Sequence, residues 1–92
     1  MKVDRAVLVL KMMGNPIRLK ILEVLAKKKT EVCVSGIEDL IGVSQSSVSQ
    51  HLAHLRNSGI LTSEKKGKKV CYNIVDDTVR EILNSLNLEN IK

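Results

Sequence analysis

The chain has 92 residues, of which 43% are hydrophobic and 27% charged, and its formal net charge is +5. This length favours one domain, residues 1–92, and the composition excludes a disordered chain. A domain this small buries only about 60% of its unfolded surface, so it gains much from a partner. No apolar run reaches the roughly 18 residues of a membrane span, so we expect no membrane association and a cytoplasmic protein. The basic excess favours nucleic acid or another anionic partner.

The first predicted helix covers residues 3–13 (VDRAVLVLKMM), and its apolar residues surround most of its axis. A helix that is apolar nearly all round must be buried on two sides. In so small a protein we expect one of those sides to face another subunit.

A second helix is predicted over residues 16–28, behind the N-cap Asn15. Arg18 falls within the buried arc of this helix. Because a buried charge needs a partner, we expect Arg18 to pair with a carboxylate, with Glu38 and Asp39 as the candidates.

Residues 30–34 are predicted to be extended and to lead into two helices joined by a short turn. Ser35, with a glutamate three positions later, has the capping-box pattern of a helix start, and this third helix ends at Gly42. Ser44 then caps a fourth helix, with Gly59 directly after its C-terminus. Two helices joined by so few residues form a helix-turn-helix pattern.

The spacing of apolar residues then changes to that of strands. Residues 60–66 and 68–74 are predicted to form a hairpin joined at KKGKK, and a last helix begins at Asp76. The predicted order is helix, helix, helix, helix, strand, strand, helix. We therefore expect a mainly helical winged helix-turn-helix with a β-hairpin wing.

Within the fourth helix, Val48, Leu52 and Leu55 keep the spacing of a buried face, whereas the other face carries serine and glutamine. Solvated helices ordinarily use lysine, glutamate and arginine there, because serine is a poorer helix former. Short neutral groups that both donate and accept hydrogen bonds suit the base edges of a DNA major groove. The pattern predicts a DNA recognition helix, and its alternative is a solvated polar face.

The predicted hairpin carries four lysines around Gly67 at its tip. They are Lys65, Lys66, Lys68 and Lys69. Such a tip suits DNA phosphates, where it would displace counterions. Taken alone it would equally suit a solubilising turn, but beside a recognition helix we interpret it as a DNA-binding wing.

Residues 12–75 resemble the ArsR/SmtB family of winged helix-turn-helix repressors. The matching segments are GNPIRLKIL, EVCVSGIEDLIGVSQSSVSQHLAHLRNSGIL and KKGKKVCYNI. The resemblance implies a homodimer through the first and last helices, bound to a pseudo-palindromic operator in double-stranded DNA. It also implies a sequence-specific repressor that an effector releases. The expected DNA contacts are Gln45, Ser46, Ser47, Ser49, Gln50, His54, Lys65, Lys66, Lys68 and Lys69.

The metal sites usual in this family are not matched. Its thiolate site has the pattern ELCVCDL, whereas this chain reads EVCVSGI and keeps only Cys33, and one thiolate does not make a soft-metal site. On the last helix Asp76 matches one ligand of the other family site, but the remaining positions lack suitable residues. The two histidines, His51 and His54, lie on the recognition helix, where a metal would compete with DNA. We expect no metal and no cofactor, and an atypical metal site using Cys33 is the alternative.

The two cysteines, Cys33 and Cys71, are expected to be free thiols in a reducing cytoplasm. Cys33 lies near a predicted helix N-terminus, which favours its thiolate, and Cys71 falls on the less apolar strand face, where we expect partial exposure. A disulfide needs the two Cα atoms within about 7 Å. Three interpretations stay open: a thiol sensor made of both cysteines, two unreactive residues, or no effector at all.

Other classes of function fit the sequence less well. It shows no set of nucleophile, base and orienting residue, no glycine-rich phosphate loop and no metal cluster, so we do not expect an enzyme. A protein-interaction module without specific DNA binding is the alternative, although such a module would not need a serine-rich recognition face.

Overall fold

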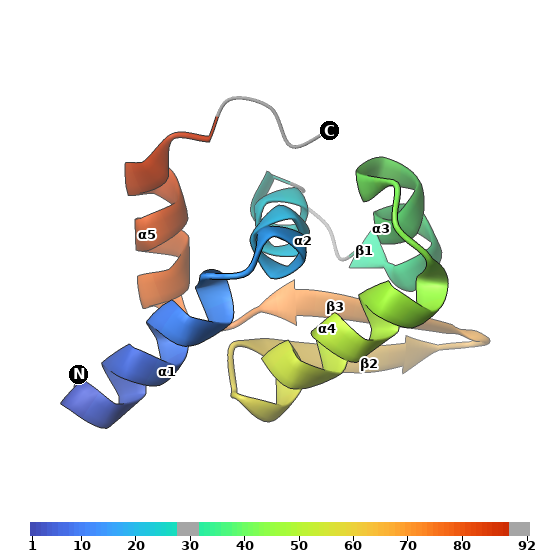
Figure 1. Ribbon diagram of the computed structural model, residues 1–92. Coiled ribbons are helices and arrows are strands. Elements are labelled where there is room, and N and C mark those ends of the chain that lie inside the picture. The colour runs from blue at the N-terminus through green and yellow to red at the C-terminus, as the bar shows by residue number, and fades with distance from the viewer. Residues whose placement is uncertain (28–31, 89–92) are drawn as a thin grey trace.

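The computed structural model describes residues 1–27 and 32–88, and only the backbone of residues 32–35, 39 and 40. Its elements are, in chain order, α1 (Val3–Met13), α2 (Pro16–Lys27), β1 (Val32–Cys33), α3 (Val34–Ile41), α4 (Gln45–Asn57), β2 (Leu61–Lys66), β3 (Lys69–Ile74) and α5 (Asp77–Leu86). Helices α3 and α4 form the helix-turn-helix, and β2 and β3 form the wing (Figure 1). The predicted winged helix-turn-helix is therefore confirmed.

The sheet has one strand more than the predicted hairpin, because β1 pairs with β3. The strand order is β1-β3-β2, and both pairings are antiparallel. In the hairpin, Lys66 lies opposite Lys69 at the tip. Both hairpin strands begin one residue later than predicted, β2 at Leu61 and β3 at Lys69. The later start of β3 follows because the turn uses Gly67 and Lys68. Gly67 has a φ of 63°, and glycine at the first central position is typical of a two-residue type II′ turn.

The core is aliphatic and centres on α2, which packs against α1, α3, α4, α5 and β3. The most deeply buried side chains, each at most 2% exposed, are Val9, Ile21, Leu22, Val24, Ile37, Val48, Leu52, Leu55, Ile60, Leu61 and Val79. Full burial of one such side chain stabilises a fold by about 1.5–3 kcal/mol. The three core residues of α4 therefore fix which face of that helix turns away from the protein.

Two predicted N-caps, Asn15 and Ser44, are confirmed by side-chain hydrogen bonds, whereas Asp76, predicted as the first residue of the last helix, is its N-cap. The Oδ1 atom of Asn15 accepts hydrogen bonds from the N–H groups of Ile17 and Arg18, at 2.9 and 3.1 Å. The hydroxyl of Ser44 accepts one from the N–H of Ser47 at 3.2 Å. At the start of α5, Asp76 accepts one from the N–H of Val79 at 3.1 Å.

The capping box predicted at Ser35 is wrong. Helix α3 begins at Val34, directly after β1 ends at Cys33. The pairing of β1 with β3 carries the chain straight into the helix, so Ser35 is the second helical residue and not the cap. The side chain of Ser35 and residues 28–31 of the predicted elements lie outside the described part of the chain. The same holds for Glu89 and Lys92, which stand at unmatched positions of the family's second metal site.

Helix α1 has one buried side and one open apolar side, as its sequence predicts. Val9 and Met13 are buried, whereas Val3, Val7 and Leu10 are 77%, 57% and 60% exposed. Helices α1 and α5 lie at the end of the molecule away from the wing tip (Figure 1). Within the described residues, no helix combines the length and apolar character needed to cross a membrane.

Candidate nucleic-acid interface

The outer face of α4 brings together most of the predicted base contacts. Five of them are exposed side chains: Gln45, Ser46, Ser49, Gln50 and His54. Residues three and four apart on a helix lie one turn apart on the same face, so Ser46, Gln50 and His54 follow one another along this surface. Ser47 is half-buried, and its N–H is held by the cap.

The turn before α4 is tight. Helix α3 ends at Ile41, and Gly42 follows with a φ of 71°, in the left-handed region that glycine adopts without strain. The N–H of Gly42 donates to the carbonyl of Glu38 at 2.9 Å. This short connection lets α3 pack directly on α4 and leaves the N-terminal end of α4 open to solvent.

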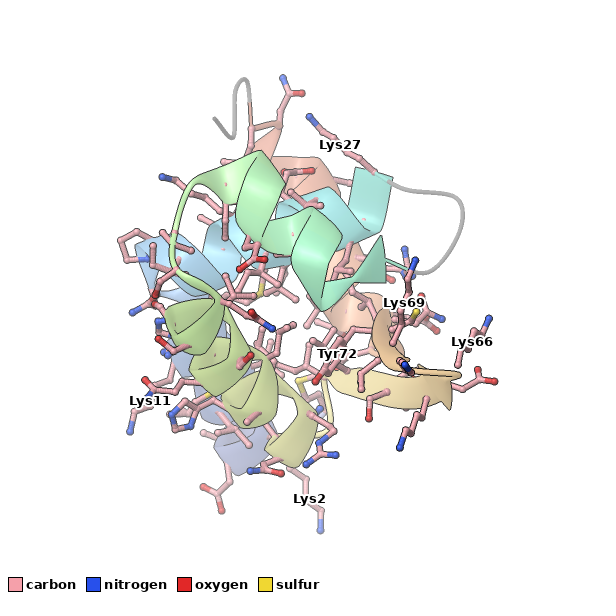
Figure 2. The ribbon with its side chains drawn as sticks, turned by 90° about the vertical axis from the view of Figure 1, so that its right-hand side faces the viewer. Lys2, Lys11, Lys27, Lys66, Lys69 and Tyr72 are labelled. Atoms are coloured by element: carbon pink, nitrogen blue, oxygen red, sulfur yellow. The ribbon has the colours of Figure 1, made fainter. Side chains whose placement is uncertain are left out.

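The wing presents the predicted lysines at one end. Lys65, Lys66, Lys68 and Lys69 are all exposed, and Lys66 and Lys69 extend from the hairpin (Figure 2). Strand β2 packs against α4, so the wing is held beside the recognition helix. Together they form a surface with a central polar, neutral helix and a basic flank.

Arg18 is not paired as predicted. Its Nε donates to the carbonyl of Met12 at 2.7 Å, and Nη2 lies 3.4 Å from the carbonyl of Lys11. The last carbonyls of a helix lack partners within that helix, and Arg18 stands just after the break between α1 and α2. It therefore satisfies the end of α1 and makes no ion pair with Glu38, while the side chain of Asp39 is outside the described part.

The same guanidinium reaches the recognition helix, because Nη1 of Arg18 lies 3.3 Å from Nδ1 of His51. Burial, then the charge of Arg18 and then His54, lowers the pKa of His51 below its ordinary value of 6.5. Arginine only donates, so the neutral ring accepts at Nδ1 and carries its proton on Nε2. His51 thus faces α1 and α2, whereas His54 is exposed on the outer face.

A second arginine, Arg5 of α1, binds the other end of α4. It donates to the carbonyl of Ser58, directly after the helix, and to the carboxylate of Asp76. This contact is not evident from the sequence, because Arg5 is 53 positions from Ser58 along the chain. The clue available was the charged Arg5 beside a long apolar run in the same helix.

The cysteines differ from the expectation of free, partly exposed thiols. Cys71 is 5% exposed and is disulfide-bonded. In the pairing of β1 with β3, the backbone of Cys33 lies directly opposite Cys71. Residues opposite each other in antiparallel strands have Cα atoms about 4.5–5.5 Å apart, within disulfide range. The prediction failed because it did not pair β1 with β3 in the sheet, which places the backbone of Cys33 opposite Cys71.

No metal centre is found among the residues that the structure describes, since no three of their His, Cys, Asp and Glu side chains are grouped to hold an ion. The side chain of Cys33 is not among them. The candidate surface consists of polar and basic side chains, which suit a polyanion.

A helix-turn-helix whose second helix turns a polar face outward, next to a basic wing, defines a winged helix-turn-helix DNA-binding transcription regulator. The profile of the family described as "Bacterial regulatory protein, arsR family" matches residues 15–63. The chain belongs to this family, which confirms the resemblance seen in its motifs.

Individual relatives are similar to this protein in sequence over most of the chain. The HTH-type transcriptional regulator MJ1325 of Methanocaldococcus jannaschii is 39% identical, over 89% of this chain and 91% of its own. The transcriptional repressor PagR of Bacillus anthracis is 34% identical with a TM-score of 0.83, covering 92% of this chain and 95% of PagR. Mb0332 of Mycobacterium bovis, a homodimeric winged helix-turn-helix DNA-binding domain, is 26% identical with a TM-score of 0.79, covering 91% and 76%. Of several other curated relatives, the chain spans only 58–60%.

Proposed function

We propose that the chain is a homodimeric repressor that binds a pseudo-palindromic operator in double-stranded DNA, in the cytoplasm. One observation carries the proposal: Val48, Leu52 and Leu55 are 0% exposed, while the glutamines and serines of α4 face outward. Burial of the apolar row fixes the orientation of the polar row. The outer face is therefore presented as a rigid unit of the size that a major groove admits.

The side chains of this face suit different parts of the duplex. Gln50, in the middle of the helix, has the amide that pairs bidentately with adenine, and Ser46 and Ser49 are small enough to allow close approach. Gln45 and Ser47 lie in the first turn, where the helix dipole favours phosphate, with the N–H of Ser47 already bound to the Ser44 hydroxyl. His54 extends the row by one turn, and the four wing lysines bind the backbone alongside.

The open side of α1 supports a dimer. Val3, Val7 and Leu10 of α1 are all more than half exposed, and Leu86 of α5 is 49% exposed. Exposed apolar side chains gathered at one end of a small domain indicate a contact surface. The homodimeric assembly of the relative Mb0332 supports the same arrangement. A twofold dimer would place two α4 helices on half-sites one helical turn apart, or a multiple of it.

For the effector, we propose that Cys33 and Cys71 form a thiol–disulfide switch. The support is the backbone register that places them opposite each other, together with the disulfide of Cys71. Strand β1 leads directly into α3 and β3 belongs to the wing, so the bond ties the start of the helix-turn-helix to the wing. Oxidation by a small disulfide removes two electrons and two protons from the two thiols and releases two small thiols. A metal-responsive site using Cys33 is the alternative effector site.

The experiment is to measure the affinity of the reduced protein for duplex DNA from just upstream of its own gene, against a shuffled duplex. Gln50→Ala should weaken specific binding about tenfold or more, since a bidentate base contact is worth about 1–3 kcal/mol. Ser49→Arg should abolish or weaken it too. Asn84→Ala, which removes an exposed amide from α5, is the matched control. Full retention of specific binding by both α4 variants would contradict the assignment and favour a protein-interaction module.

The same assay tests the effector. Tight binding by the reduced protein, lost after oxidation and restored by a reductant, would support the switch, and Cys71→Ser should bind irrespective of oxidant. If oxidant changes DNA binding in neither protein, the operator proposal stands, but the cysteines are not the effector site. Release of the reduced protein by added Zn²⁺ or Cd²⁺ would favour the metal alternative.

A further inference from the structure

A cavity between α2 and α5 lies apart from the DNA-binding surface. It has a volume of about 210 Å³ and is lined by Glu23, Ala26, Lys27, Leu83, Asn84, Asn87 and Leu88. Glu23 and Lys27 belong to α2, Asn84 belongs to α5, and Asn87 is the C-cap residue of α5. Helices α2 and α5, which pack on each other, therefore both supply polar groups to this cavity.

Glu23 is the unusual member of this set. It is 6% exposed and the only charged residue among the buried described side chains. Among the described residues, none forms an ion pair with its carboxylate and none donates a hydrogen bond to it, whereas Lys27, one turn along α2, stays exposed. No side-chain oxygen of the described residues is both fully buried and without a hydrogen-bond partner. The carboxylate oxygens of Glu23 therefore keep contact with solvent, although the rest of the residue is buried.

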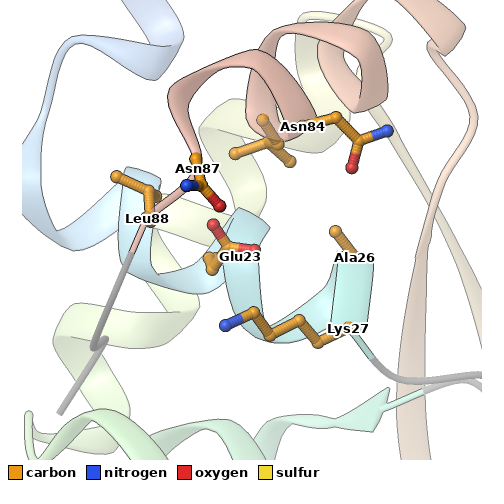
Figure 3. Close-up of a pocket in the computed structure, with 7 residues that line it drawn as sticks. Glu23, Ala26, Lys27, Asn84, Asn87 and Leu88 are labelled. Carbon is orange, nitrogen blue, oxygen red and sulfur yellow. The ribbon is translucent and has the colours of Figure 1, made fainter.

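The carboxylate meets solvent through the cavity, which Glu23 lines. In Figure 3, Glu23 of α2 and Asn87 at the end of α5 point toward each other across the hollow, with the amino group of Lys27 beside them. A carboxylate, an ammonium group and two amides of both hydrogen-bonding types line the same space. The cavity wall carries one negative charge, on Glu23, and one positive charge, on Lys27. A small ligand with one positive and one negative group could pair with both.

We propose that this cavity binds a small zwitterion of the amino-acid class. The ligand's ammonium group pairs with Glu23, its carboxylate pairs with Lys27, and Asn84 and Asn87 bond to the remaining polar atoms. The volume equals that of roughly seven liquid water molecules and lies below the range of about 300–1,000 Å³ typical of drug-sized ligands. It therefore suits a short amino acid and excludes a nucleotide. Ligand binding in this cavity does not require DNA binding.

The test is a two-dimensional NMR titration of the dimer or monomer, whichever the chain forms, with 3-aminopropanoate and 4-aminobutanoate. We expect a Kd of about 1 mM or tighter for at least one of them, with shifts at the amides of Glu23, Lys27, Asn84 and Asn87. Propylamine and butanoate, which carry one charge each, should bind at least about tenfold more weakly, because each leaves one wall charge unmatched. No shift at these amides with either zwitterion at ten times the expected Kd would overturn the proposal.

Variants separate ligand binding from folding. Glu23→Gln keeps the size and shape of the side chain, so the Tm of the free protein should stay close to that of the unaltered chain, while zwitterion binding should weaken at least tenfold. Lys27→Met should remove the preference for a zwitterion over propylamine. The matched control Glu81→Gln changes an exposed carboxylate on α5 that does not line the cavity, and it should bind as the unaltered chain does. Equal zwitterion affinity in Glu23→Gln and the unaltered chain would also overturn the proposal.

Discussion

Arg5 of α1 and Asp76 at the start of α5 form an ion pair, with 2.9 Å between Nη2 and Oδ2. The same guanidinium donates to the carbonyl of Ser58, so one side chain joins α1 to the end of the recognition helix and to the start of α5. Burial opposes ionisation of Asp76, but the hydrogen bonds from Arg5 and from the N–H of Val79, together with the charge of Arg5, lower its pKa below the ordinary 3.8. The two helices of the proposed dimer surface are thus tied directly to the helix proposed to bind DNA.

We predict that Arg5→Met destabilises the domain by about 1–2 kcal/mol. The change leaves the Ser58 carbonyl and the partly buried Asp76 carboxylate without their donor, and removing such a donor typically costs about 1–3 kcal/mol, less where solvent screens the pair. Urea unfolding followed by circular dichroism would measure it. Arg56→Met is the control, because Arg56 is exposed and its side chain makes no interaction with the described residues. Equal stability of both variants would show that Arg5 does not hold these elements together.

We predict that His51 makes the fold less stable in mild acid. Its pKa is lowered in the folded protein, so the unfolded chain binds a proton first as the pH falls below 6.5. Its contribution to stability is therefore complete above pH 6.5 and is lost as the pH falls through the folded-state pKa. Unfolding free energies at pH 7.5 and 5.0 should show a smaller decrease for His51→Gln than for the unaltered chain.

His54→Gln is the matched control for this pH effect. His54 is exposed and is the smallest of the three causes that lower the pKa of His51. Most of the acid-dependent decrease should therefore remain in His54→Gln. A decrease that disappears in His54→Gln and persists in His51→Gln would refute the role given to the contact between His51 and Arg18.

Features that depend on neighbouring residues along the chain could be predicted from the sequence. Asn15 and Ser44 were placed correctly as caps because an N-cap needs only a short polar side chain at a helix start. The outward face of α4 followed from the spacing of its buried leucines. Contacts across the fold could not be read in the same way: the partners of Arg18, the burial of Cys71 and the cavity around Glu23 depend on how distant elements pack.

We predict that the wing sets part of the salt dependence of DNA binding. Replacing Lys66 and Lys68 together with glutamine should flatten the plot of log K against log salt by about 0.9 for each phosphate that the wing no longer neutralises. Filter binding or fluorescence anisotropy over a range of salt concentrations would measure the slope. Lys27→Gln removes an exposed lysine far from α4 and the wing (Figure 2), and should leave the slope unchanged. An unaltered slope in the wing variant would show that these lysines do not bind phosphate.

We predict that Val7→Asp prevents dimerisation. Val7 is 57% exposed on the open side of α1, so an aspartate there fits the monomer, but a dimer would have to bury its charge without a partner. Such burial costs several kcal/mol, and each 1.4 kcal/mol is about tenfold in the association constant. Sedimentation equilibrium should therefore show at least a tenfold weaker dimer, with an unchanged circular dichroism spectrum. Val75→Asp alters a side chain that is 50% exposed outside the helices, and it should leave the dimer intact. If Val7→Asp dimerises as strongly as Val75→Asp, then the subunits do not meet through this side of α1.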